Sequence, residues 1–294
     1  MTNEPSRTAT KAALITGASS GIGEAAARAL ASAGYRVAVV ARREERLSHL
    51  VKTITTAGGE AIALTADLSE ESATRHAAGA ALDAFGQIDL LVNNVGFSPG
   101  AALEQMSRDD LRHIFEVNLL SSLQMTAELI PGMRERRAGR ILNIGSIGGS
   151  IPAPLAVPYA ATKAGLAAAT RGLRLELSPW NIHVSLIVPG FVDTAVFDNA
   201  RRGSESLRAD PDNPYRQTFF DLDELAERNL RNALSPEDIA RVIVRAATAR
   251  RPRERYFAPF GARVQTTFMN LLPERVADAI LTRLYKLDRY TTAG

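Results

Sequence analysis

Two residues four positions apart, Tyr159 and Lys163, have the types and spacing for proton-transfer chemistry, and Ser146 precedes them in the chain. On a helix, positions i and i+4 lie on one face, so the ammonium can lie beside the phenol. A nearby positive charge stabilises a phenolate and lowers its pKa. Moving the pKa of a tyrosine from about 10 to about 7 requires about 4 kcal/mol, which an ammonium and a charged cofactor can supply in a dry cleft. The pair therefore predicts redox or elimination chemistry, although the same spacing also occurs on purely structural helices.

A glycine-rich turn lies near the N-terminus. It runs from Thr16 to Gly23 and separates an apolar run from an alanine-rich segment. Strand, glycine-rich turn and helix is the arrangement that a dinucleotide requires. Gly17 permits the tight turn, Gly21 lets the backbone approach a pyrophosphate, and Gly23 lets the helix pack close to the strand. The N–H groups and the dipole at the start of the helix then favour phosphate binding.

The composition excludes several classes of function. The chain has 294 residues, of which 46% are hydrophobic, and a net charge of +3. It has no basic arm, so we expect no nucleic-acid partner. The absence of cysteine excludes disulfides and thiol catalysis, and the four histidines lack metal-ligand spacing, so no metal is expected. The polar first residues and the lack of an apolar run of about 18 residues predict neither a secretory signal nor a transmembrane segment, and favour a cytoplasmic protein.

Short β-branched runs alternate with longer helical patterns along the chain. This alternation predicts a doubly wound parallel α/β sheet of about seven strands, with helices on both faces. The expected strands are Ala12 to Thr16, Arg36 to Val40, Ala61 to Thr65, Leu90 to Asn93, Arg140 to Ile144, His183 to Val188 and Arg255 to Ala258. Ser107 and Ser235, each followed by Asp three residues later, mark two helix starts.

The patterns divide the chain into one main domain and its flanking segments. The segment near residues 193–234 lacks a clear pattern and follows a late strand, where a substrate lid would lie; the alternative is a surface excursion. The expected parts are a flexible tail (1–10), a dinucleotide-binding catalytic domain (11–260) and an amphipathic helical extension (261–294).

Taken together, these motifs resemble the short-chain dehydrogenase/reductase family over about residues 11–258. The pieces that carry the resemblance are the glycine turn, Asp67-Leu68, Asn93-Asn94-Val95-Gly96, Asn118, Ser146, Tyr159 with Lys163, and Pro189-Gly190 followed by Thr194. The resemblance implies a Rossmann-type single domain and an NAD(P)-dependent oxidoreductase that acts on CH–OH or C=O groups. Val95 departs from the family pattern, which more often has alanine there, and could crowd the cofactor slightly.

The resemblance also implies a role for each matching residue. Ser146 would hydrogen-bond the substrate oxygen, and Tyr159 would act as acid or base. Lys163 would bind the nicotinamide ribose and lower the tyrosine pKa, while Asn118 would hold a water that relays protons. Asp67 and Leu68 would contact adenine, Asn94 the ribose region, and Val192 and Thr194 the carboxamide. The full expected cofactor set is Gly17, Ser19, Ser20, Gly21, Ile22, Gly23, Arg42, Arg43, Asp67, Leu68, Asn94, Gly96, Tyr159, Lys163, Pro189, Gly190, Val192 and Thr194.

The end of the second expected strand indicates which nicotinamide cofactor binds. An acid about twenty residues after the glycine turn binds the ribose 2′-hydroxyl of NAD, whereas an arginine suits the 2′-phosphate of NADP. Ala41 occupies the acid's place and Arg42 follows it, so Arg42 is expected to pair with the 2′-phosphate, with Arg43 next to it. Guanidinium–phosphate bonds are worth about 1.5 to 3 kcal/mol each, so NADP (NADPH) is expected. Alternatively, Arg42 and Arg43 are part of a solvated helix start with Glu44 and Glu45 and do not bind the cofactor.

The substrate is less strongly indicated. Apolar residues flank the catalytic segments and recur in the lid: Phe97, Ile151, Pro152, Leu155, Val196, Phe197, Phe219, Phe220 and Leu222. They favour a bulky apolar ketone or secondary alcohol. Arg201, Arg202 and Arg216 would instead suit an anionic carrier, so a 3-oxoacyl-thioester reductase is the alternative enzyme. A non-catalytic NADP-binding scaffold or sensor is the alternative from another class.

The last prediction from the sequence concerns contacts with other molecules. The family resemblance and the small residues after Lys163 predict a homodimer or homotetramer. In the extension, Val276, Ile280, Leu284 and Leu287 form one apolar stripe that must be buried somewhere. It could cap the substrate cleft, pack on a neighbouring subunit or lie on a membrane. The small excess of positive charge favours protein over lipid.

Overall fold

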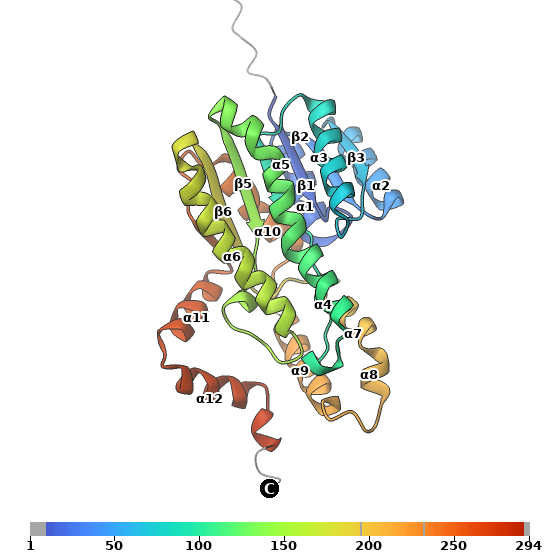
Figure 1. Cartoon of the computed structure of the whole chain (residues 1–294), viewed down its shortest axis with the longest axis vertical. Coiled ribbons are helices and arrows are strands. Elements are labelled where there is room, and N and C mark those ends of the chain that lie inside the picture. The colour runs from blue at the N-terminus through green and yellow to red at the C-terminus, as the bar shows by residue number, and fades with distance from the viewer. Residues whose placement is uncertain (1–9, 195, 232, 291–294) are drawn as a thin grey trace, which may run out of the picture.

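The computed structural model describes residues 10–194, 196–231 and 233–290. At its centre, seven parallel strands form one sheet in the order β3-β2-β1-β4-β5-β6-β7 (Figure 1). The strands are β1 (Ala12–Thr16), β2 (Arg36–Ala41), β3 (Ala61–Thr65), β4 (Leu90–Asn93), β5 (Gly139–Ile144), β6 (Ile182–Pro189) and β7 (Arg255–Ala258). The predicted doubly wound fold is confirmed, and each predicted strand ends within one residue of the observed one.

Helices cover both faces of the sheet, which is why its strands are apolar almost throughout. Ala13 and Ile15 of β1 face one layer, whereas Ala12 and Leu14 face the other, and all four are fully buried. The first layer contains α1 (Gly21–Ser32), α2 (Glu44–Thr56) and α10 (Pro236–Thr248). The second contains α3 (Glu71–Phe85), α5 (Ser121–Arg136) and α6 (Val157–Leu177).

Two helices begin where the sequence predicts, because a serine caps each of them. Ser107 Oγ accepts a hydrogen bond from the backbone N–H of Asp110 at 3.0 Å, and the Asp110 carboxylate accepts one from the Ser107 N–H at 2.9 Å. Ser235 and Asp238 make the same reciprocal pair at the start of α10. Such a box satisfies N–H groups that the first turn leaves unpaired. The box of Ser107 and Asp110 fixes the start of α4 (Arg108–Phe115), and a π-helical turn (Glu116–Leu120) joins α4 to α5.

Two helical additions project from the carboxyl ends of the strands (Figure 1). Between β6 and α10 lie α7 (Val196–Gly203), α8 (Glu205–Ala209) and α9 (Arg216–Leu230). After β7 come α11 (Phe260–Leu271) and α12 (Glu274–Leu284), which we call the C-terminal arm together with the short helix Leu287–Tyr290. Three other single turns, Leu103–Gln105, Ile147–Gly149 and Ser178–Trp180, complete the elements described.

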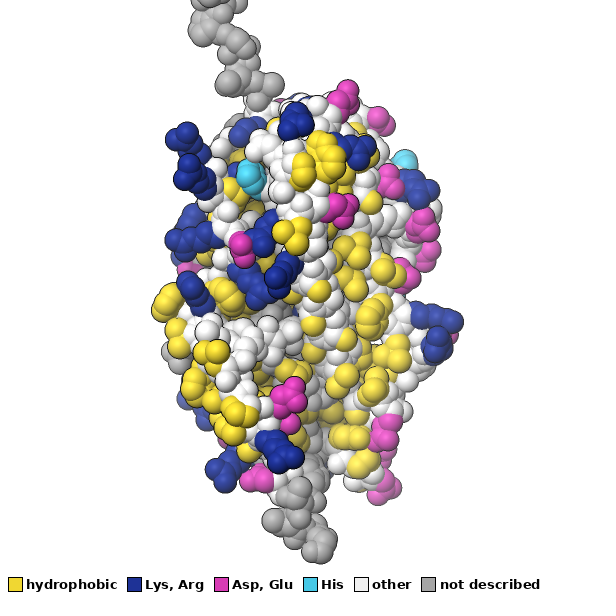
Figure 2. All heavy atoms as spheres, turned by 60° about the vertical axis from the view of Figure 1, so that its left-hand side comes forward, with side chains coloured by type: hydrophobic (Ala, Val, Ile, Leu, Met, Phe, Trp, Pro, Cys, Tyr) yellow, Lys and Arg dark blue, Asp and Glu magenta, His cyan; other side chains and the backbone are white. Residues whose placement is uncertain are grey.

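The arm carries its apolar stripe on the surface of the single chain. Val276, Ile280 and Leu284 of α12 are exposed, and α12 has no buried residue. Figure 2 shows apolar side chains gathered on this side of the molecule. The expectation that the stripe is buried is therefore not met within one chain. The expected homo-oligomer stays a prediction, which light scattering would test. No helix among the described residues is long and apolar enough to cross a bilayer.

Candidate active site

A cavity of about 990 Å³ opens at the carboxyl ends of the central strands. It follows the glycine turn, the ends of β2 to β6, the start of α6 and the inner faces of α7 and α9. The order of the sheet reverses between β1 and β4, and ligands of doubly wound folds bind at this switch point. Every predicted catalytic and cofactor residue lines the cavity except Gly23 and Asn118, which lie directly behind its wall.

The glycine turn has the backbone that a dinucleotide turn needs. Gly17 and Gly21 have φ of +65° and +57°, in the left-handed region that glycine adopts without strain. Gly23 is needed for its small size, because a Cβ at this position would lie only 2.4 Å from the Gly17 carbonyl oxygen. The side-chain amide of Asn94 donates to the carbonyls of Thr16 and Gly17, at 3.1 and 3.2 Å. Asn94 thus ties β4 to the turn through its side chain.

Ser146, Tyr159 and Lys163 meet on the opposite wall of the cavity. Ser146 follows β5, and the other two stand one helical turn apart at the start of α6. A hydrogen bond joins the side chains of Tyr159 and Ser146. The Lys163 Nζ donates to the carbonyl oxygen of Ile144 at 2.9 Å and lies 5.8 Å from the centre of the tyrosine ring. A phenol and a serine hydroxyl side by side can hydrogen-bond one substrate oxygen and move a proton to or from it.

The protein groups alone do not lower the pKa of Tyr159. Burial raises it, and the hydrogen bond with Ser146 offsets only part of that increase. Burial also lowers the pKa of Lys163 to about 8, because the charged ammonium is desolvated. The predicted depression of the tyrosine pKa is therefore not found in the protein by itself. The main reason is burial of the phenol, and the Lys163 ammonium donates its hydrogen bond to the Ile144 carbonyl.

Asn118 supports this wall from behind. Its amide nitrogen donates to the Phe97 carbonyl at 2.8 Å and to Thr162 Oγ1 at 3.3 Å, and its oxygen accepts from the Phe97 N–H at 3.0 Å. These bonds join the loop after β4 to α6. The loop packs so closely that a Cβ on Gly96 would lie 3.3 Å from the Lys163 Nζ. Asn118 therefore ties this loop to α6 near Lys163, and its predicted role in a proton relay stays a prediction.

The two arginines after β2 have different surroundings. Arg43 donates from Nη2 to the hydroxyl oxygens of Ser19 and Ser20, at 2.8 Å each. Partial burial, and then the nearby charges of Arg46 and Arg42, lower the pKa of Arg43. Arg42 is more exposed and forms a 3.7 Å ion pair with Asp67. Both line the cavity, but only Arg43 is held against the glycine turn.

The remaining walls are mostly apolar. Seven of the nine predicted substrate residues line the cavity: Phe97, Ile151, Leu155, Val196, Phe197, Phe219 and Leu222. Pro152 does not, and Phe220 points out of the cavity, where it is 43% exposed and Arg216 lies over its ring. On α9, Phe219, Leu222, Ala226 and Leu230 recur at spacings of three and four, which selects one helical face. That periodicity could have excluded Phe220 from the sequence alone.

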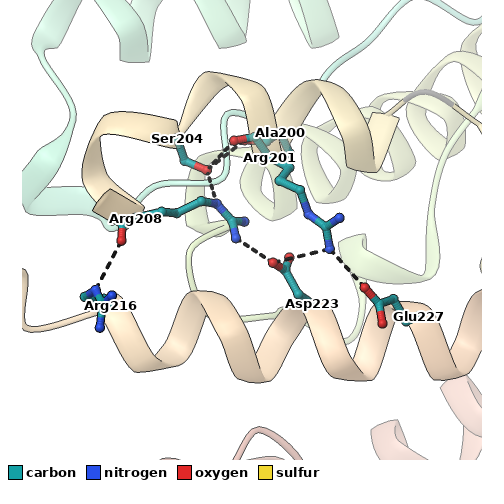
Figure 3. A network of polar contacts seen from close by, with 7 residues as sticks. All are labelled: Ala200, Arg201, Ser204, Arg208, Arg216, Asp223 and Glu227. Carbon is teal, nitrogen blue, oxygen red and sulfur yellow. Dashed lines mark hydrogen bonds and ion pairs between the residues drawn. The ribbon is translucent and has the colours of Figure 1, made fainter. Parts of the chain in front are cut away.

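A charged network that the sequence did not predict joins α7, α8 and α9 to one another (Figure 3). The Asp223 carboxylate of α9 pairs with Arg208 at 2.6 Å and with Arg201 at 3.3 Å. Arg201 also lies 3.4 Å from Glu227, and the Arg208 Nε donates to Ser204 Oγ at 2.8 Å. Arg208 covers the Phe219 ring as well. The charge of Arg201, predicted to receive an anionic carrier, is thus already paired, while Arg202 and Arg216 lie outside the cavity lining.

Known proteins are similar to this chain in sequence and in fold. Residues 11–205 match the profile of the short chain dehydrogenases. A putative ketoacyl reductase of the granaticin polyketide synthase from Streptomyces violaceoruber is 39% identical over 202 residues, which cover 68% of this chain and 74% of that one. This chain belongs to the short-chain dehydrogenase/reductase family. The recognised resemblance is confirmed, and the chain is an oxidoreductase of that family.

Solved members of the family superpose on most of the chain. A variant of actinorhodin polyketide ketoreductase, solved with NADPH, is 31% identical with a TM-score of 0.73 and covers 86% of this chain and 97% of its own. A family member from Burkholderia phymatum, solved with NAD, is 30% identical with a TM-score of 0.77, covering 88% and 92%. No group of three or more His, Cys, Asp or Glu that could hold a metal occurs in the described residues.

The space around two glycines predicts that alanine substitutions there change the stability of the fold in opposite directions. Gly23→Ala should destabilise the fold by about 1 to 3 kcal/mol, because its methyl group would overlap the backbone oxygen of Gly17. Gly172→Ala, in the middle of α6, should stabilise it by about 0.5 to 1 kcal/mol, because nothing lies within 4 Å of the new Cβ and alanine favours a helix. Denaturant unfolding of both variants measures the difference; equal effects would contradict the packing described for Gly23.

Proposed function

We propose that the protein uses NADPH to reduce a bulky, apolar ketone to a secondary alcohol. The observation that carries the proposal is a single cavity with three walls. The glycine turn and Arg43 form the first, Ser146, Tyr159 and Lys163 form the second, and apolar residues of α7 and α9 form the third. The first wall fits a phosphorylated dinucleotide, the second fits a carbonyl oxygen, and the third fits an apolar group.

The proposed reaction balances with the groups that the cavity brings together. Bound reduced nicotinamide would supply a hydride to the carbonyl carbon. The electron pair of the C=O bond moves to the oxygen, which takes the phenolic proton of Tyr159 while the Ser146 hydroxyl donates a hydrogen bond to it. The products would be the alcohol, the oxidised nicotinamide and a tyrosinate, which regains a proton from solvent. Lys163 lies close enough for its charge to favour that tyrosinate.

Burial of Tyr159 suits the reductive direction. A raised pKa keeps the phenol protonated near neutral pH, and reduction consumes that proton. Oxidation of an alcohol would need the phenolate, which burial of the phenol disfavours. Within this proposal, the protein alone is poised as a proton donor.

One prediction from this mechanism concerns the proton donor. Tyr159→Phe should reduce turnover at least a hundredfold while NADPH affinity stays within about twofold, because only one hydroxyl is removed and general acids contribute about 10² to 10⁴ in rate. Steady-state rates and cofactor titration measure the two effects. Tyr35→Phe is the matched control and should keep its rate, because the Tyr35 hydroxyl donates to the Ala247 carbonyl and Tyr35 is not among the cavity-lining residues. A Tyr159 variant that retains a tenth of the wild-type rate would exclude the tyrosine as the acid.

The choice of NADPH rests on Arg43 and Ala41. Ala41 is buried and supplies no carboxylate for a ribose hydroxyl, and Arg43 is held beside the serine hydroxyls of the turn. The guanidinium can pair with a 2′-phosphate while its position is fixed by Ser19 and Ser20. The actinorhodin enzyme, which was solved with NADPH, supports the choice; the Burkholderia structure was solved with NAD, so a direct measurement is needed.

Arg43→Ala should therefore weaken NADPH about tenfold to a hundredfold and leave NADH within about threefold, since one charge-assisted pair is worth about 1.5 to 3 kcal/mol. Arg42→Ala is the matched control, because its charge is paired with Asp67 and it makes no bond to the turn. It should have the smaller effect. Calorimetric titration with both cofactors measures the four affinities. Equal binding of NADPH and NADH to the wild type would rule out the assignment.

A 3-oxoacyl thioester is the second candidate substrate, because the granaticin relative carries the name ketoacyl reductase. The paired state of Arg201 and the apolar wall of α9 favour the simple ketone. The discriminating experiment follows NADPH absorbance with long-chain methyl ketones and with N-acetylcysteamine thioesters of 3-oxo acids. A higher kcat/KM on the ketones supports the proposal, a higher value on the thioesters replaces it with the second candidate, and no turnover on either contradicts both.

A further inference from the structure

The C-terminal arm reaches back to the substrate cavity at its end. Gln265 of α11, and Leu284 and Tyr285 where α12 ends, line the same cavity as Tyr159. Tyr285 is partly buried there, and its burial raises the pKa of its phenol. By contrast, α12 itself buries no residue. The arm is therefore in contact with the body of the protein at its tip, where it meets the cavity and α9.

Ion pairs hold that tip on α9. The Arg289 Nη2 lies 2.9 Å from one carboxylate oxygen of Asp221, and the Lys286 Nζ lies 3.7 Å from the other. Lys286 also pairs with Glu224 at 2.7 Å. Asp221 and Glu224 stand three residues apart on α9 and so lie on one helical face, opposite two cations of the arm.

Asp221 is the buried member of this cluster. Its side chain is only 7% exposed, whereas that of Glu224 is 72% exposed. Within α9, Gln217 donates a long hydrogen bond of 3.4 Å to Asp221. A buried carboxylate is costly unless cations and donors compensate it, and the arm brings two cations to it. The docked position of the arm is thus coupled to the burial of Asp221.

The backbone turns sharply at this contact. Lys286 has φ of +56°, a left-handed conformation that a lysine rarely adopts without support. This turn separates Tyr285, which lines the cavity, from Lys286 and Arg289, which pair with α9. The same short segment therefore both contacts the cavity and is anchored beside it.

We propose that residues 284–289 form a latch that closes the far end of the substrate cavity, with Asp221 as its anchor and Tyr285 as a specificity-determining residue. The class of ligand is a ketone whose carbonyl lies at Tyr159 and whose long apolar group extends to Leu284 and Tyr285. A short ketone does not reach the latch. The role in substrate choice rests on the function proposed above, whereas the docking of the latch on α9 does not.

Hydrogen exchange tests the docking without any substrate. Asp221→Asn and Arg289→Gln should each speed amide exchange in residues 284–289 at least threefold, and the double variant should add little, because both changes break the same pair. Arg75→Gln is the matched control: it removes exposed ion pairs with Glu71 and Glu128, and Arg75 is not among the cavity-lining residues. Unchanged exchange at 284–289 in both single variants, or equal acceleration in the control, would overturn the latch.

Kinetics test the role in substrate choice. With NADPH, Asp221→Asn and Tyr285→Ala should raise KM for methyl nonyl ketone about threefold to tenfold, while KM for methyl ethyl ketone and for NADPH stays within about twofold. Arg75→Gln, the control used for hydrogen exchange, should keep the KM for both ketones, because Arg75 is not among the cavity-lining residues. Equal changes for the two ketones, or no change for either, would overturn the specificity role. A wild type that reduces neither ketone would contradict the proposed function and leave the exchange result to decide the docking.

Discussion

The close join between β1 and β4 is the constraint on which the site depends. At the point where the strand order reverses, the Thr16 hydroxyl accepts a hydrogen bond from the Asn94 N–H at 2.9 Å, and the Asn94 amide donates to the first two carbonyls of the turn. The glycine turn belongs to one strand, and the loop that packs on Lys163 belongs to the other. Without this join, the wall suited to a dinucleotide and the wall with Tyr159 would not keep a fixed separation. Catalysis by positioning needs that separation to be held closely.

The site also depends on burying groups that water would otherwise solvate. Lys163 is 5% exposed, and a backbone carbonyl replaces part of its hydration. Charges in such a place interact more strongly than in water, because the surrounding dielectric is low. The protein alone therefore leaves the tyrosine protonated and the lysine easier to deprotonate. Binding of a charged cofactor would change the protonation equilibria of both Tyr159 and Lys163, so these equilibria depend on what binds in the cavity.

The sequence predicted the features that short stretches determine. The strands, the two serine caps and the glycine turn depend on residues within a few positions of one another, and they are found where expected. The two arginines after β2 show where this fails. Adjacent residues of extended backbone point in opposite directions, so sequence order alone could not tell that Arg43, more than Arg42, lies against the turn. Asp223 with Arg208, and Asp221 with Arg289, are pairs that only the folded chain brings together.

The bonds from Arg43 to Ser19 and Ser20 have a consequence for how the turn recognises an anion. A hydroxyl oxygen that accepts a hydrogen bond from the guanidinium keeps its own proton to donate elsewhere. The arginine therefore orients both hydroxyl protons away from itself, and its charge makes them better donors. The adenosine end and the pyrophosphate end of a dinucleotide would then meet one polarised unit instead of two independent contacts. The 2′-phosphate that only NADPH carries would contact the same guanidinium, so NADPH would use the whole unit and NADH only a small part of it.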